Sequence, residues 1–153
     1  MRHATAADHA ALGQVMFAAI HAQGSPYSAA QCAAWLPAPP HGPEWETRLA
    51  AQIVLLEDGP EGPQGFVSLT RAGYVDLAFI LPQARGTGLF RRLMEGLERE
   101  AGRQGITRLT THASLAAEGP FLALGFTATA RERITRADQA LERCAMEKRL
   151  SAG

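Results

Sequence analysis

The chain has 153 residues, of which 46% are hydrophobic, with 15 basic and 15 acidic side chains and a net charge of zero. This length suits one domain with a sizeable core, and the hydrophobic content is too high for a disordered chain. The charge balance gives no electrostatic reason to expect binding to nucleic acid or to an anionic membrane. We therefore expect a single folded domain over residues 1–153 that has neither of these partners.

Cysteine usage and the N-terminus bear on the compartment. Cys32 and Cys144 match no metal-binding spacing, so we expect two reduced cysteines and no metal site. No apolar run is long enough to span a membrane, and Asp8 and His9 interrupt any signal-peptide core near the start. These observations predict a cytoplasmic protein.

The first half of the chain predicts a short strand, three helices and an antiparallel hairpin. Thr5 and Ser28 are suitable N-caps for the first two helices. A tight connection at Ala72-Gly73 favours an antiparallel pair between the strands on either side. The expected segments are a strand at 1–5, helices at 6–23, 28–36 and 44–51, and strands at 53–56, 65–71 and 74–81.

The second half changes to a strand–helix–strand order, which implies a parallel pair of strands joined by a crossover helix. Its expected segments are a helix at 89–103, a strand at 108–113, a helix at 116–124, and two closing strands at 126–134 and 141–150. The whole chain therefore predicts an α/β (α+β) fold. We expect a mixed central sheet of about six to seven strands flanked by about four helices.

The stretch from Gln83 to Gly88 lies between a predicted strand and a predicted helix. Its glycines let backbone N–H groups approach a ligand closely, and the following helix N-terminus adds unpaired donors and a positive dipole end. Arg85, Arg91 and Arg92 stand at the same helix start, where a bound polyphosphate would offset their repulsion from the dipole. The turn thus predicts a phosphate site. The simpler alternatives are a structural glycine turn and solvated surface arginines.

Two motifs together resemble those of the GNAT acetyltransferase superfamily. Gln83, Gly86 and Gly88 match that family's Gln/Arg-x-x-Gly-x-Gly/Ala signature, and the block 113–126 resembles a later block that ends in Gly-Phe. The first half resembles a narrower, YafP-like bacterial branch. That second resemblance rests on Tyr27-Ser28, Gln31, Ala34-Trp35, Pro37 and Trp45.

The resemblance implies the GNAT fold, with acetyl-CoA as co-substrate and transfer of its acetyl group to a primary amine by direct attack. The amine acceptor itself, a small molecule or a peptide, is not identified by any motif. A homodimer is expected because many GNAT proteins are dimers. The alternative function is a non-catalytic coenzyme A-binding regulatory module.

The resemblance also implies a set of coenzyme A contacts. Backbone N–H groups near the glycines would bind the pyrophosphate, and backbone groups of the preceding strand would pair with the pantetheine arm and polarise the thioester carbonyl. Ser114 is expected to contact coenzyme A through its hydroxyl, or else to serve as an N-cap. The implied residues are Arg85, Gly86, Thr87, Gly88, Leu89 and Phe90 for the pyrophosphate, with Phe79, Ile80 and Leu81 for the pantetheine arm.

The catalytic residues are less firmly implied. Asp76, early on the strand before the glycines, is the first candidate for the general base and Glu57 is the second, with water as the alternative. Their simpler interpretations are a polar residue on a solvated strand face and a turn residue. Phe121 occupies the position at which most GNAT proteins have the Tyr that protonates the leaving thiolate. Phe121 is expected instead to pack against the pantetheine arm. The general acid stays open between water and Tyr27.

Overall fold

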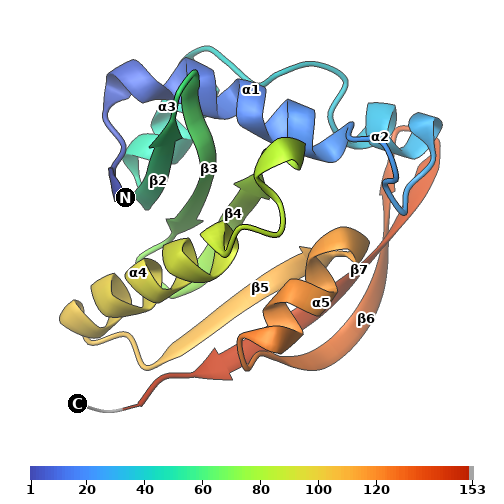
Figure 1. The fold of residues 1–153 in the computed structure, drawn as a ribbon. Coiled ribbons are helices and arrows are strands. Elements are labelled where there is room, and N and C mark those ends of the chain that lie inside the picture. The colour runs from blue at the N-terminus through green and yellow to red at the C-terminus, as the bar shows by residue number, and fades with distance from the viewer. Residues whose placement is uncertain (152–153) are drawn as a thin grey trace.

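The computed structural model describes residues 1–151 and contains a seven-stranded mixed sheet with helices on both faces (Figure 1). The strand order is β1-β2-β3-β4-β5-β7-β6. The strands are β1 (Arg2–His3), β2 (Ile53–Gly59), β3 (Gly62–Leu69), β4 (Tyr74–Ile80), β5 (Arg108–Ser114), β6 (Thr127–Arg136) and β7 (Gln139–Arg149). The α-helices are α1 (His9–Ile20), α2 (Ala29–Trp35), α3 (Pro43–Ala50), α4 (Leu89–Arg103) and α5 (Leu115–Ala123).

The predicted fold class is confirmed, with five α-helices in place of about four. The expected first helix is shorter than predicted, because Ala6–Asp8 forms a 3₁₀ turn before α1 and α1 ends at Ile20. Thr5 is the N-cap of that turn, and its backbone N–H donates to the Asp8 carboxylate at 2.8 Å. The side chain thus satisfies a terminal N–H that the tight turn leaves without a backbone partner.

Two hydrophobic clusters hold the helices to the sheet. Helix α4, with Leu93, Met94 and Leu97 fully buried, packs with α5 on one face. Helices α1, α2 and α3 cover part of the other face, where Leu12 and Leu49 are buried. Both faces are therefore apolar where helices cover them, which explains the continuous apolar run Ile53–Leu56 at the start of β2.

All but one of the strand pairs are antiparallel, including the predicted β3–β4 hairpin. The exception is β4 with β5, which are parallel, as the strand–helix–strand order predicted. These two strands pair over two positions only, Tyr74 with Thr110 and Val75 with Thr111, and then diverge (Figure 1). The second half of β4 consequently has a strand neighbour on one side alone.

Candidate active site

The divergence of β4 from β5 begins at a β-bulge. In β3, the neighbouring residues Leu69 and Ser68 lie opposite Val75 and Leu77 of β4. Asp76, between these two, has no partner in β3 and is the extra residue of the bulge. A bulge bends its strand and increases the local twist, which turns the rest of β4 away from β5. The bulge therefore accounts for the opening beside the second half of β4.

The backbone groups that face this opening follow from the ladder of β3 and β4. The Leu81 N–H donates to the Gln64 carbonyl of β3 at 2.8 Å, one step beyond the Ile80–Gly65 pair. Antiparallel residues alternate between bonding across the pair and facing away from it. Ile80 and Ala78 therefore direct their N–H and C=O groups toward the open side, whereas Leu81 and Phe79 direct theirs toward β3.

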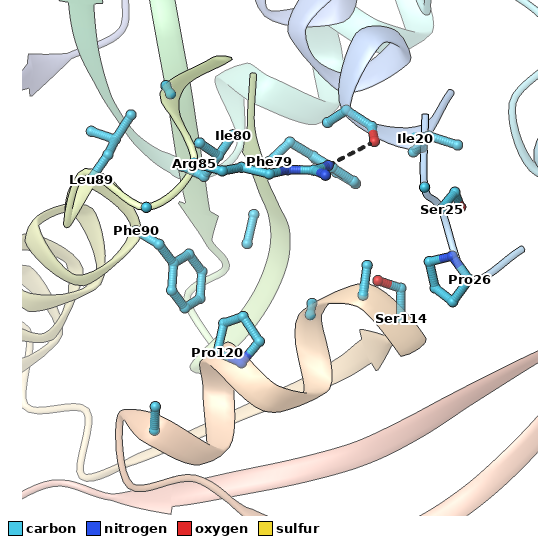
Figure 2. Close-up of a pocket in the computed structure, with 18 of the residues that line it drawn as sticks. Ile20, Ser25, Pro26, Phe79, Ile80, Arg85, Leu89, Phe90, Ser114 and Pro120 are labelled. Carbon is cyan, nitrogen blue, oxygen red and sulfur yellow. Dashed lines mark hydrogen bonds between the residues drawn. The ribbon is translucent and has the colours of Figure 1, made fainter. Parts of the chain in front are cut away.

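A cavity of about 550 Å³ occupies the opening (Figure 2). One wall is the second half of β4, and a second is formed by the glycine turn and the start of α4. The other walls come from α5 and from the end of α1 with the loop that follows it. Arg85 and Arg91 are the only charged residues among the described residues that line this cavity.

The glycine turn presents unpaired backbone donors to this cavity. Gly86 and Gly88 both have positive φ angles, 76° and 82°, a backbone conformation that a side chain strains. Among residues 1–151, the N–H groups of Gly86, Thr87 and Gly88 donate to no protein acceptor. Helix α4 starts at the next residue, so the N–H groups of its first turn join them. The turn is thus a run of donors at a helix N-terminus, which favours a phosphate ligand.

The three arginines of this region have different partners. The Arg85 guanidinium crosses the cavity and donates to the Ala19 carbonyl of α1 at 3.2 Å (Figure 2). Arg92 does not line the cavity and forms an ion pair with Glu57 at 2.7 Å. Arg91 lines the cavity. Of the three, Arg85 and Arg91 are therefore placed to meet an anionic ligand.

The comparisons with known proteins agree with this geometry. The family model described as "Acetyltransferase (GNAT) domain" matches residues 25–150, which is most of the chain. The chain belongs to the GNAT acetyltransferase family. The narrower resemblance to a YafP-like branch stays a prediction. The comparison with curated proteins found no match.

Solved structures of GNAT proteins share the fold. A GCN5-related N-acetyltransferase from Rhodopseudomonas palustris is similar over 97% of this chain and 94% of the other, with 28% identity and a TM-score of 0.89. The putative acetyltransferase yncA from Salmonella typhimurium, solved with acetyl-CoA, is similar over 99% of this chain and 94% of its own, with 22% identity and a TM-score of 0.72. A phosphinothricin acetyltransferase from Sinorhizobium meliloti, in complex with acetyl-CoA, is similar over 99% of this chain and 88% of its own, with 18% identity and a TM-score of 0.72.

The two carboxylates predicted as bases in this GNAT chain both lie in ion pairs with arginine. Asp76 accepts from Arg48 Nε at 2.8 Å, from a second Arg48 nitrogen at 2.9 Å and from Gln52 Nε2 at 2.8 Å. Burial alone would raise the pKa of Asp76, but these hydrogen bonds outweigh it and hold that pKa below its ordinary value. The hydrogen bond from Arg92 likewise lowers the pKa of Glu57. Neither side chain lines the cavity.

Ser114 and Phe121 lie differently with respect to the cavity. Ser114 is the N-cap of α5 and lines the cavity, yet its side chain makes no capping hydrogen bond within the described chain (Figure 2). Its hydroxyl is therefore available to a ligand. Phe121 is only 2% exposed and packs edge-on against Phe90 and Phe126, with ring centroids 5.1 and 4.9 Å apart. Phe121 therefore packs behind Phe90, which lines the cavity, and does not line the cavity itself.

Tyr27, the alternative candidate for the general acid, has its hydroxyl engaged on both sides. It donates to the Glu142 carbonyl of β7 at 2.5 Å and accepts from the Leu115 N–H at 3.0 Å. Burial raises the pKa of Tyr27. Tyr27 thus joins the α1–α2 loop to the far wall of the opening, and its proton is held by a backbone carbonyl.

Several lining residues were not among the site residues that the sequence motifs predicted. Ala78 was not predicted because its role depends on the alternation of the β3–β4 ladder, which the hairpin register supplies. Trp35 and Ile20 enter the cavity from helices that are distant in sequence from the glycine turn. Among residues 1–151, no helix is long and apolar enough to cross a bilayer, and no three His, Cys, Asp or Glu side chains are placed to hold a metal ion.

Proposed function

We propose that this GNAT protein transfers the acetyl group of acetyl-CoA to a primary amine of a small molecule or a peptide. The observation that carries the proposal is the meeting of two features in one cavity. Gly86 and Gly88, whose N–H groups are unpaired like that of Thr87 between them, line the same cavity as Ala78 and Ile80 on the open edge of β4. The first feature suits a pyrophosphate and the second suits an extended chain that carries amide groups.

The glycine turn would bind the pyrophosphate of coenzyme A. Its N–H groups, with those of Leu89 and Phe90 in the first turn of α4, supply charge-assisted hydrogen bonds that water would otherwise supply. The Arg85 N–H already donates to the Pro82 carbonyl at 3.3 Å, so Arg85 contributes through its guanidinium. The positive end of the α4 dipole adds to the attraction.

The pantetheine arm would lie along the open edge of β4. Of the three residues expected to pair with it, Ile80 faces the opening, whereas the Leu81 N–H bonds to β3 and the register turns Phe79 toward β3 as well. Phe79 still lines the cavity with its side chain, and Ala78 supplies the second open backbone position. The Ser114 hydroxyl would contact the arm from the opposite wall.

The reaction would proceed by direct attack. The lone pair of the amine nitrogen forms a bond to the thioester carbonyl carbon, the carbon–sulfur bond breaks, and coenzyme A leaves as the thiolate. The Ile80 N–H would stabilise the negative charge that develops on the carbonyl oxygen. The nitrogen loses its proton to water, and water protonates the thiolate, whose ordinary pKa of about 8.5 by analogy with cysteine permits this at neutral pH.

Water is the proposed proton carrier because the candidate side chains have other partners. Within the described residues 1–151, Asp76 accepts from Arg48 and Gln52 and Glu57 accepts from Arg92, and neither carboxylate lines the cavity. A carboxylate whose pKa is lowered in this way is also a weaker base. The general acid expected from the family pattern is absent at Phe121, which is buried.

A covalent acetyl-enzyme is not part of the proposal. Cys32 and Cys144 are 4% and 1% exposed, and neither lines the cavity. Burial raises the pKa of the Cys144 thiol, which lowers its thiolate fraction and hence its reactivity.

The test measures free thiol release from acetyl-CoA with a panel of primary amines, together with calorimetry of acetyl-CoA binding. Amine-dependent thiol release and an acetylated amine are the expected result. Binding of acetyl-CoA without turnover across the panel would instead support a non-catalytic coenzyme A-binding module. An acetylated protein in mass spectra after mixing with acetyl-CoA alone would contradict direct attack.

A further inference from the structure

The end of the cavity opposite the glycine turn differs from the rest in its chemistry. We call it the acceptor end and define it by its lining residues Ile20, Pro26, Tyr27, Trp35 and Phe79. Figure 2 shows Ile20 and Pro26 across the cavity from Leu89 and Phe90, which begin α4. If coenzyme A takes the glycine turn and the open edge of β4, this end is left for the acceptor. The inference therefore rests on the proposed function.

Aromatic rings form the main surface of the acceptor end. Trp35 stands between Tyr27 and Phe79, with ring centroids 5.7 Å from the first and 6.2 Å from the second. Trp35 and Phe79 are partly exposed, so their rings retain accessible apolar surface. Binding is favoured when a ligand removes such apolar surface from water, and aromatic ligands add favourable ring contacts.

The Tyr27 hydroxyl at the acceptor end, and the Ser25 hydroxyl beside it, are already engaged within the protein. The Tyr27 hydroxyl both donates and accepts, to Glu142 and from Leu115. The Ser25 hydroxyl accepts from the Tyr27 N–H at 3.1 Å. No carboxylate lines any part of the cavity among residues 1–151, and the charged lining residues are Arg85 and Arg91, of which Arg85 bonds to the Ala19 carbonyl beside Ile20.

This arrangement disfavours polycationic acceptors. An ammonium group transferred here would lose its hydration, gain no carboxylate partner and approach a fixed positive charge, and each of these effects lowers the pKa of an amine. A single amine can enter in its neutral form, which is also the nucleophilic form. A polyamine or an aminoglycoside would have to desolvate several charges at once.

We propose that the acceptor is a primary monoamine with an apolar, aromatic body, and that the rings of Trp35 and Phe79 bind that body. The amine would point from the rings toward the open edge of β4. An arylalkylamine such as 2-phenylethylamine has this chemistry, whereas spermidine does not.

Tryptophan fluorescence tests this inference without any need for turnover. The chain has two tryptophans, and the second, Trp45, is 4% exposed with its indole N–H bonded to the His9 carbonyl. Titration of 2-phenylethylamine into the protein saturated with free coenzyme A should change the tryptophan emission saturably. The Kd from this titration should be at least tenfold lower than the Kd for spermidine. The change should persist in Trp45→Phe and disappear in Trp35→Phe. Equal or tighter binding of spermidine would overturn the proposal, as would a change that persists in Trp35→Phe.

Steady-state kinetics supply the second measurement. Trp35→Ala should raise the KM for 2-phenylethylamine at least tenfold while the affinity for acetyl-CoA measured by calorimetry stays within twofold, and circular dichroism checks the fold. An unchanged KM would overturn the proposal. Turnover of spermidine but not of 2-phenylethylamine would overturn it while leaving acetyl transfer intact. Saturable binding at Trp35 with no thiol release from any amine would support the aromatic subsite and count against the proposed function alone.

Discussion

The two halves of β4 have opposite surroundings. In the first half, from Tyr74 to Leu77, strand β4 has neighbours on both sides, because Tyr74 and Val75 pair with β5 while Val75 and Leu77 pair with β3. The Asp76 side chain in this half is held by Arg48. The second half, from Ala78 to Ile80, pairs with β3 alone and faces a cavity on its other side. The first half of β4 therefore helps to hold the sheet together, whereas the second half is free to bind a ligand along its edge. The bulge at Asp76 separates the two halves. Mutations on either side of this boundary should therefore fail in different ways.

The largest effect is expected at Gly86, beside the second half. A Cβ built on Gly86 meets no protein atom within 4 Å, so in Gly86→Ala it occupies space that the pyrophosphate would need. We expect acetyl-CoA affinity, measured by calorimetry, to fall about a hundredfold, which is about 2.7 kcal/mol.

Gly105→Ala is the matched control for Gly86→Ala. Gly105 has a similar positive φ of 73° and equally open space around its Cβ, but it does not line the cavity. Both variants should lose about 1–2 kcal/mol of unfolding free energy to backbone strain, and the control should keep its affinity. Equal affinities in the two variants would contradict the assignment of the pyrophosphate to the glycine turn.

A smaller and different effect is expected at Asp76, in the first half. Asp76→Asn weakens the pairing with Arg48 and Gln52 and should lower the unfolding free energy by about 1–2 kcal/mol at pH 7. Turnover should fall by less than about tenfold, in keeping with the proposed route of the proton to water. A loss of turnover of a hundredfold or more in a folded variant would return the role of base to Asp76.

The pH dependence of stability tests whether the hydrogen-bonded Asp76 carboxylate stabilises the fold. The folded pKa of Asp76 lies below its ordinary value, so the unfolded chain binds more protons in acid. The stabilising contribution is therefore fully present above the ordinary pKa of an aspartate and is lost as the pH falls through the lower, folded pKa. Denaturant unfolding at neutral and acid pH should show a smaller loss of stability in Asp76→Asn than in the unmodified protein.

The smallest effect is expected at Ser114. Because its side chain makes no capping bond, Ser114→Ala should leave the unfolding free energy nearly unchanged. Acetyl-CoA affinity should fall about two- to tenfold, the contribution of one hydrogen bond.

Ser28→Ala is the control for Ser114→Ala and should give the opposite result. The Ser28 hydroxyl accepts from the Gln31 N–H at 3.1 Å and caps α2. That variant should lose about 1 kcal/mol of stability and keep its affinity. A destabilised Ser114→Ala with unaltered affinity would make Ser114 a structural cap.

Local sequence signals were sufficient for most of the fold. Alternation, helical spacing and the positions of glycine and proline located all seven strands, and the glycine turn located one wall of the cavity. The details that decide the chemistry depend on contacts between distant residues. Asp76 lies 28 positions from Arg48, and only the folded chain shows that they pair. In the same way, the depth of Phe121 and the partner of the Leu81 N–H depend on packing and register, which no local pattern contains.

Amide hydrogen exchange, followed residue by residue by NMR with and without acetyl-CoA, tests the central claim most directly. The account predicts that acetyl-CoA slows exchange at Ile80 and at Gly86, Thr87 and Gly88, whose N–H groups have no acceptor across the β3–β4 ladder or in the glycine turn. Exchange at Leu77 and Leu81, which already donate to β3, should change little. Protection confined to the first half of β4, or no protection at the glycine turn under saturating acetyl-CoA, would contradict the account.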